Sequence, residues 1–291
     1  MLKEWPLVAF TVAGQAAVGI FLFAGLPLFL SAGAGGNAAA REARLVALAV
    51  VLGLLAVAAL LSLFHLHHPF RARRVLTNIG TSWLSREIFF ELGFMALVSL
   101  GLFLVWSGWD GTGITRGIMI AAAILGVLFI LSMSKLYMLP SVPIWNQAYT
   151  PLAFALTALN LGAMVTALVL RFRDIHGDYS IGLLEFSFFC VGGEILLALF
   201  IAPRHGFYGF RPGPSLRPPD KTPRLLHWGR LTFLAAGLFL LGLALYPRAL
   251  MGSVRSGPGS NGLLAMALVL VLAGEVAGRF LFYGLLTRPG R

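Results

Sequence analysis

The sequence contains very little charge. Only 11% of its 291 residues are charged, whereas 58% are hydrophobic. A soluble domain carries about 25% charged residues, so this chain has too few to cover a surface that faces water. Its polar residues are gathered into short segments between long apolar runs. The composition argues against a soluble enzyme and predicts a polytopic membrane protein.

Cysteine is almost absent. The one cysteine, Cys190, lies inside an apolar run, and one thiol forms no intrachain disulfide. A thiolate-bound iron–sulfur cluster needs about four cysteines. None of the six histidines lies in the middle of an apolar run, so a haem held by two histidines is not expected either. We therefore expect this chain to bind no metal, haem or cluster, and we interpret Cys190 as a packing residue.

Acidic residues are few relative to basic ones. The chain has 22 Lys and Arg against 11 Asp and Glu, a formal net charge of +11. On a soluble chain this excess would indicate nucleic acid binding. Here the basic residues flank the apolar runs, where they act as topology signals and contact anionic lipid. Nucleic acid is not an expected partner.

The apolar residues form eight runs, each near the ~20 residues that cross a bilayer as a helix. The first is longer than the ~7–15 residues of a cleaved signal core, so we expect it to remain as a span. The runs do not alternate as barrel strands do. We predict one all-α integral membrane domain, 1–291, with spans at about 6–30, 45–66, 86–108, 116–139, 150–170, 181–202, 226–246 and 262–286.

An even number of spans places both termini on one side, here called the N side. Most flanking basic residues lie on it, including those of the proline-rich loop 203–225. The positive-inside rule then favours a cytoplasmic N side. The alternative is that this loop owes its charge to docking of a partner subunit. The side that the termini face stays open.

Five carboxylates fall inside the predicted spans: Glu87, Glu91, Glu185, Glu194 and Glu275. A charge near the bilayer centre costs at least ~2.5–3.5 kcal/mol, so such residues face the bundle interior, pair or stay protonated. Glu275 and Arg279 lie four residues apart, which favours a structural pair. For Glu194, a neutral hydrogen-bonded carboxyl and a role in a proton path are equally supported.

Glu87 and Glu91 share one helix face near the N side, and their like charges repel. Groups able to bind a ligand or accept a proton occur at the same level. They are His65, Arg71, Lys135, Tyr137, Trp145, Tyr149, Arg279 and Tyr283. Each has a simpler interpretation, since Tyr and Trp often anchor a helix at the interface. Their co-location indicates a site for a long apolar ligand with a polar, proton-releasing head, such as a quinol. Its electrons would have to leave to a partner subunit.

Four stretches carry motifs: EWPLVAFTVAGQ (Glu4 to Gln15), HLHHPFRARRVLTNIGTSWLSREI (His65 to Ile88), VPIWNQAYTPLAFALT (Val142 to Thr157) and GEVAGRFLFYG (Gly274 to Gly284). In order, spacing and total length they resemble the membrane anchor subunit of dimethyl sulfoxide reductases, which is related to polysulfide reductase-type anchors. The most specific part is His-Leu-x-x-Pro-x-Arg-Ala followed by Leu-Ser-x-Glu-Ile.

The resemblance implies an eight-helix, haem-free anchor in the inner (plasma) membrane that serves anaerobic respiration. It implies that the chain binds menaquinol and passes electrons to an iron–sulfur subunit, which reduces a molybdopterin catalytic subunit. His65 and Glu87 correspond to the family's quinol-site histidine and acid, and Arg71 to its loop arginine. We expect His65 and Glu87 to accept the quinol protons, with Arg71 stabilising negative charge and Glu91, Tyr137 and Trp145 lining the site.

Two other functions compete with this hypothesis. A secondary transporter would show broken helices in two repeated halves, and no internal repeat is evident. A tether with a degenerate quinol site is disfavoured by the intact His65 and Glu87. The sequence leaves open the terminal acceptor, the direction of electron flow, the quinone type and any proton-motive coupling. Quinol oxidation would in any case require the partner subunits.

Overall fold

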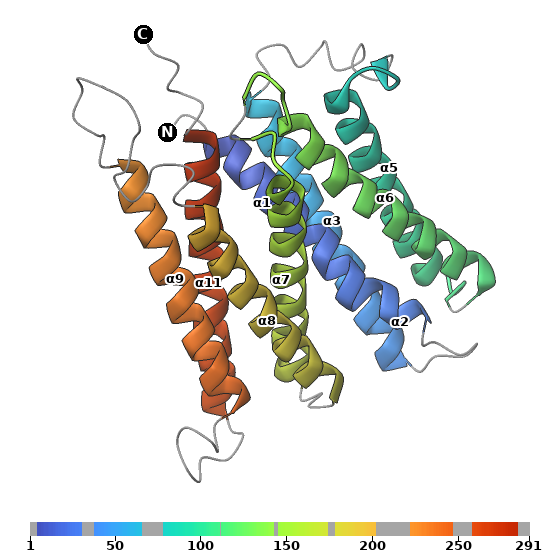
Figure 1. Ribbon diagram of the computed structural model, residues 1–291. Helices are drawn as coiled ribbons and strands as arrows, with labels where there is room; N and C mark the ends of the chain where they lie inside the picture. Colours follow the sequence, from blue (N-terminus) through green and yellow to red (C-terminus); the bar gives the residue numbers. More distant parts are fainter. Residues whose placement is uncertain are drawn as a thin grey trace, which may run out of the picture. The chain divides into compact units, whose positions relative to one another are not determined.

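The computed structural model describes residues 5–30, 38–65, 78–110, 112–142, 145–173, 178–201, 222–246 and 258–284. The first helical segment consists of α1 (Trp5–Ile20), a π-helical turn η2 (Phe21–Gly25) and α2 (Leu26–Leu30). The other helices, shown in Figure 1, are α3 (Ala38–His65), α5 (Trp83–Trp106), α6 (Gly113–Tyr137), α7 (Tyr149–Phe172), α8 (Asp178–Ile201), α9 (Thr222–Leu245) and α11 (Pro258–Gly284).

In the described part of the chain, eight helical segments are long and apolar enough to cross a membrane, as the sequence predicts. Their bounds differ from the predicted ones by a few residues, partly because polar caps begin helices before the apolar run does. Ser82 accepts a hydrogen bond from the Ser85 backbone N–H at 3.4 Å, and Thr112 accepts one from that of Thr115 at 3.2 Å. Such caps satisfy N–H groups that the first helical turn leaves without partners.

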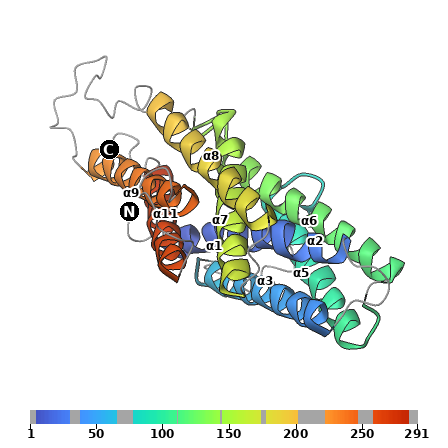
Figure 2. The same cartoon turned by 90° about the horizontal axis from the view of Figure 1, so that it is seen from below.

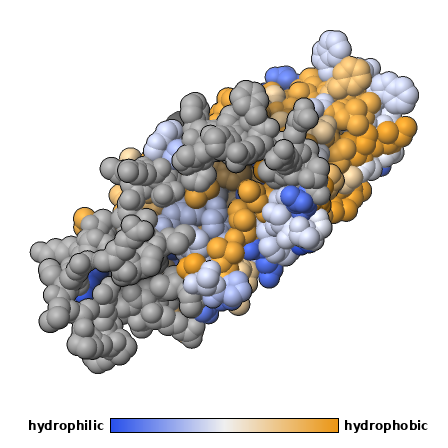
Figure 3. Space-filling model, turned by 90° about the horizontal axis from the view of Figure 1, so that it is seen from above, coloured by the Kyte–Doolittle hydropathy of each residue, from blue (hydrophilic) through white to orange (hydrophobic). Residues whose placement is uncertain are grey.

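The outer surface of the described helices is rich in large apolar side chains. Trp106, Phe189 and Leu196 are among the most exposed, and Figure 3 shows orange apolar groups over much of the surface that is not grey. Apolar patches of this extent mark an interaction with membrane or protein. The exposed faces are therefore consistent with lipid contact.

The chain divides into two compact units. The N-terminal unit is Ala9–Gly162, and the C-terminal unit is Ala163–Arg291 together with Met1–Val8. The N-terminal unit holds α3, α5, α6 and most of α1, whereas the C-terminal unit holds α8, α9 and α11. Each unit is described by itself. The single domain expected for 1–291 and the common side of the termini both stay predictions.

Close backbone contact between α1 and α7 organises the N-terminal unit. A Cβ atom on Gly19 would lie 1.9 Å from the Ala158 carbonyl oxygen, and one on Gly162 would lie 2.2 Å from the carbonyl carbon of Gly19. Only glycine permits this approach, which is how membrane helices gain van der Waals contact in the absence of a hydrophobic driving force.

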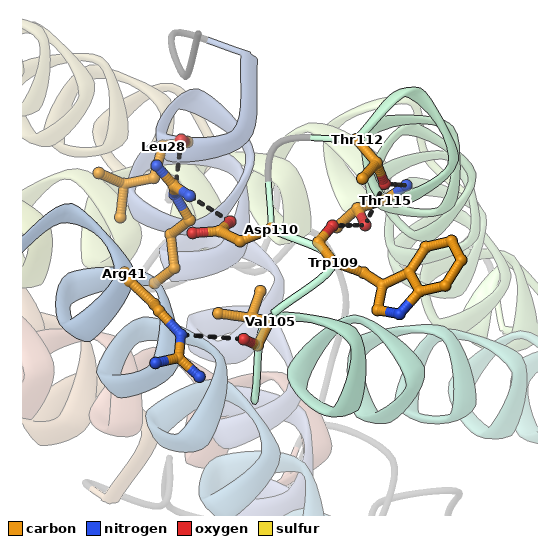
Figure 4. A network of polar contacts seen from close by, with 8 residues as sticks. Leu28, Arg41, Val105, Trp109, Asp110, Thr112 and Thr115 are labelled. Atoms are coloured by element: carbon orange, nitrogen blue, oxygen red, sulfur yellow. Dashed lines mark hydrogen bonds and ion pairs between the residues drawn. The ribbon is translucent and has the colours of Figure 1, made fainter. Parts of the chain in front are cut away.

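A polar network joins α2 and α3 to the loop between α5 and α6 (Figure 4). Arg44 is buried, forms an ion pair with Asp110 and donates from Nε to the Leu28 carbonyl oxygen at 3.1 Å. Arg41 donates to the carbonyl oxygens of Val105 at 3.1 Å and Trp106 at 2.7 Å. The sequence presents both arginines as topology signals. The structure shows that they also hold helix ends together.

Candidate functional site

The predicted quinol-site residues all belong to the N-terminal unit. Glu87 and Glu91 lie in the first turns of α5, Tyr137 is the last residue of α6, and Trp145 lies in the connection to α7. His65 is the last residue of α3, and its side chain is outside the described part of the chain. Arg71 also lies outside the described residues.

The packing of α5 on α6 fixes the level of the two carboxylates. A Cβ atom on Gly101 of α5 would lie 2.1 Å from Met119 of α6, and one on Gly126 of α6 would lie 3.3 Å from Phe94 of α5. The two helices are therefore antiparallel, side by side in Figures 1 and 2. Both helices rise 1.5 Å per residue, so the same pairing of positions continues along them. Glu87 therefore lies level with Met133, one turn from the end of α6.

The packing of α3 on α5 brings the end of α3 to the same level. The hydrogen bond from Arg41 to the Val105 carbonyl oxygen joins the start of α3 to the end of α5. Leu48 of α3 lies 3.8 Å from the Cβ position of Gly101. These two contacts show that α3 and α5 are antiparallel. If the same pairing of positions continues along them, the backbone of His65 lies level with the first turn of α5. The structure thus brings the His65 position within about one turn of Glu87.

Glu87 and Glu91 are buried as the sequence analysis expects of carboxylates inside a span. They are 2% and 5% exposed. In each, Oε1 is buried and has no hydrogen-bond partner among the described residues. Leaving a polar group in this condition costs about 1–3 kcal/mol, and more when the group is charged. Two such carboxyl groups on one face need either protons or a hydrogen-bonding ligand.

Gln15 is a further polar residue at this level and is not among the predicted site residues. It lies on α1, is fully buried, and its Nε2 donates to Met133 Sδ at 3.5 Å. Since Met133 is level with Glu87, the Gln15 amide lies at the depth of the carboxylates. The signal in the sequence was an amide within an otherwise apolar run. A buried amide offers both a donor and an acceptor to a ligand head.

Aromatic side chains form a wall at the same end of the unit. The ring of Tyr137 lies edge-to-face with that of Trp145, at 5.5 Å between centroids, and is 5.9 Å from that of Phe154. Thr150 holds the Trp145 segment by donating to its carbonyl oxygen at 2.7 Å. Tyr137 and Trp145 are both buried. Both rings therefore pack inside the unit, and their role in lining a quinol site stays a prediction.

The remaining carboxylates of the predicted spans lie in the C-terminal unit and divide into two kinds. Glu194 and Glu275 are buried, as is Arg279. Glu185 lies on an exposed face of α8. Of the three arrangements expected for such a carboxylate, facing the interior does not apply to Glu185 among the described helices, because nine positions separate it from Glu194 and put the two on opposite sides of α8.

Comparison with known proteins decides the family. A family model described as the DMSO reductase anchor subunit (DmsC) matches residues 1–207. The chain belongs to the DMSO reductase anchor subunit family. Two similar proteins are both named as anaerobic dimethyl sulfoxide reductase chains. One is YnfH from Escherichia coli strain K12, and the other is from Haemophilus influenzae.

The similarity to these two proteins extends over nearly the whole chain. The Escherichia coli protein is 33% identical over 285 residues, which cover 97% of this chain and 94% of the relative. The Haemophilus influenzae protein is 30% identical over 287 residues, covering 98% and 95%. The resemblance found in the sequence motifs is confirmed. As a member of an anchor subunit family with eight apolar helices, the chain is a multi-pass membrane protein that works with other subunits.

Proposed function

We propose that this anchor subunit oxidises menaquinol in its N-terminal unit and passes the electrons to a docked iron–sulfur subunit. That subunit would reduce a molybdopterin catalytic subunit in anaerobic respiration at the inner (plasma) membrane. The observation that carries the proposal is the pair of buried carboxyl groups, Glu87 and Glu91, whose Oε1 atoms have no partner among the described residues. They lie level with the end of α3, where His65 is located.

The chemistry requires proton acceptors and an electron acceptor. Oxidation of a quinol to a quinone releases two protons and two electrons. His65 and Glu87 are the proton acceptors, one for each hydroxyl group, and Arg71 stabilises the negative charge that develops when a proton leaves. Positioned acids and bases of this kind contribute about 10²–10⁴-fold to a rate. The electrons go to the partner, because we expect no redox cofactor in this chain.

The remaining residues bind the quinol head. Tyr137 and Trp145 present ring edges and faces to its aromatic ring, which is favourable for stacked or edge-to-face pairs. Gln15 donates or accepts a hydrogen bond at the depth of Glu87. Glu91 lies one turn deeper on α5 than Glu87 and can take over a proton from it. The names of the relatives, which are dimethyl sulfoxide reductase chains, support electron flow from quinol toward the catalytic subunit.

The test compares two electron donors in the assembled complex. A reduced menaquinol analogue must use the anchor, whereas reduced viologen delivers electrons directly to the partner subunits. We expect His65→Ala and Glu87→Gln to abolish turnover with the quinol and to preserve it with viologen. Glu185→Gln, on the exposed face of α8, is the matched control. If both site variants kept the wild-type rate with quinol, the chain would be a tether and the proposal would be wrong.

A further inference from the structure

The buried face of α5 changes from acidic to aromatic one turn below the carboxyl groups. Glu87, Glu91 and Phe94 lie on that face, because residues three or four apart are neighbours on the surface of a helix. Phe94 is fully buried and lies about 10 Å along the axis from Glu87, at 1.5 Å per residue. The surface below the two carboxyl groups is therefore made by Phe94 and by the residues that pack against it.

Three helical segments hold the Phe94 ring in place. A Cβ atom on Gly126 of α6 would lie 3.3 Å from Phe94 Cε2 and 3.3 Å from Val18 Cγ1 of α1, so the glycine leaves room for both groups. The ring of Phe21, at the start of η2, lies edge-to-face with that of Phe94, at 5.2 Å between centroids. Phe21 is also fully buried. Phe21 and Phe94, here called the aromatic floor, thus lie in an apolar layer below the acids.

The π-helical turn η2 begins at Phe21. The Leu26 backbone N–H donates to the Phe21 carbonyl oxygen, five residues back instead of four. In an uninterrupted α-helix Phe29 would be rotated about 80° from Phe21, whereas one inserted residue reduces this angle to about 20°. Phe29 is fully buried, and the Arg44 guanidinium of α3 lies 5.7 Å from its ring centroid. The turn therefore lets α2 pack on α3 while Phe21 stays against α5. Such turns occur frequently at functional sites.

The position of Tyr137 limits where a quinol head can lie. Tyr137 is the last residue of α6, one turn beyond the level of Glu87. A head that is bonded to Glu87 is bounded by the Tyr137 ring in that direction. In the other direction it extends past Glu91 toward the aromatic floor.

We propose that the aromatic floor contacts the fused second ring of a naphthoquinol and so determines which quinol the site accepts. The proposal rests on the proposed function, since it concerns the same quinol. Aromatic edges and faces attract a further aromatic ring. A benzoquinol with methoxy groups would bring ether oxygens to a layer whose side chains contain no hydrogen-bond donor. Burying a polar atom without a hydrogen bond is unfavourable, so the floor selects the two-ring head over the one-ring head.

The test compares two quinols in the assembled complex. One is a reduced naphthoquinone analogue, the other a reduced benzoquinone analogue with methoxy groups, and reduced viologen, which bypasses the anchor, measures assembly. We expect the wild type to have the higher kcat/KM with the naphthoquinol. Phe94→Leu and Phe21→Leu should each lower the ratio of the two kcat/KM values by about 2- to 10-fold, the effect of losing one aromatic pair.

Two phenylalanines provide matched controls with the same substitution. Phe89→Leu changes a residue on an exposed face of α5, and it should leave both stability and the ratio unchanged. Phe29→Leu changes a fully buried residue of the same unit that lies beside Arg44 rather than below the acids. It should lower the unfolding temperature without changing the ratio, which is the result expected of a phenylalanine with a purely structural role.

Photolabelling of the wild-type complex gives a second measurement that needs no variant. A naphthoquinone with an azide on its fused ring should label the peptides that contain Phe21 and Phe94. If the floor variants fail to assemble, the labelled peptides alone decide the proposal.

The outcomes separate this proposal from the proposed function. An unchanged ratio in both floor variants, or label only elsewhere in the N-terminal unit, would overturn the floor. The proposed function would still stand if Glu87→Gln abolished turnover with both quinols. Full turnover of Glu87→Gln, or label confined to α8, α9 and α11, would instead contradict the proposed function and the floor with it.

Discussion

Two pairs of buried carboxyl groups lie among the described residues, and their surroundings differ. In the N-terminal unit, Glu87 and Glu91 lie four residues apart on one helix, and neither has an ion-pair partner among the described residues. In the C-terminal unit, Glu194 and Glu275 come from different helices and have Arg230 and Arg279 beside them. Cations stabilise a buried negative charge. The first pair is thus suited to exchange protons with a ligand, and the second to hold its negative charge beside the two arginines.

The largest expected effect comes from two double variants, each of which replaces both acids of one pair. One should lose stability and the other quinol turnover. Glu194→Gln with Glu275→Gln leaves the buried Arg279 and the partly exposed Arg230 without a carboxylate, which costs about 3–5 kcal/mol. We expect the double variant to lose thermal stability and to co-purify poorly with its partners. Glu87→Gln with Glu91→Gln removes no ion pair of the described residues. That double variant should assemble normally and lose quinol turnover by about 10²–10⁴-fold.

Thermal unfolding of the detergent-solubilised complex and donor-specific turnover measure the two effects. If the Glu87 and Glu91 double variant were the less stable of the two, the distinction between the pairs would fail. Arg71, outside the described residues, would then be the first candidate for a hidden counter-charge.

A steric substitution in the N-terminal unit gives an intermediate effect. Gly162→Ala places a methyl group 2.2 Å from the Gly19 backbone, so α1 and α7 must separate. Overpacking of this kind costs about 1–3 kcal/mol, and we expect a lower unfolding temperature and weaker quinol turnover. Gly53→Ala on α3 is the control, because nothing lies within 4 Å of its Cβ position. Equal stability of the two variants would show that the close contact does not support the unit.

The smallest expected effect concerns Gln15. Gln15→Leu keeps a side chain of similar size against Met133 and removes one hydrogen-bonding group at the depth of Glu87. A neutral hydrogen bond contributes about 0.5–1.5 kcal/mol, which corresponds to an increase of about 2- to 10-fold in KM for the quinol. The rate with viologen should not change. Ser99→Ala, on an exposed face of α5, is the control. A KM for Gln15→Leu equal to that of the control would remove Gln15 from the site.

The sequence predicted the spans well because length and hydropathy alone decide whether a helix can cross a bilayer. It placed Glu87, Glu91, Tyr137 and Trp145 at one level because the first three lie near the same end of their spans and Trp145 lies in the loop at that end. It was less successful with Arg230, which counts as a flanking basic residue in the sequence but lies beside Glu194 in the structure. Position along one helix does not reveal which face of it another helix covers.

The sequence by itself determined the class of the protein: eight apolar helices, very few charges, and motifs specific enough to indicate the anchor family. These properties are local, since each is a sum over neighbouring residues. Only the tertiary structure decided which acids meet which partners. Glu194 lies beside Arg230 of a neighbouring helix, while Glu185, on the same helix, is exposed. Such pairings depend on helix register and on glycine contacts between distant segments, which one-dimensional patterns do not contain.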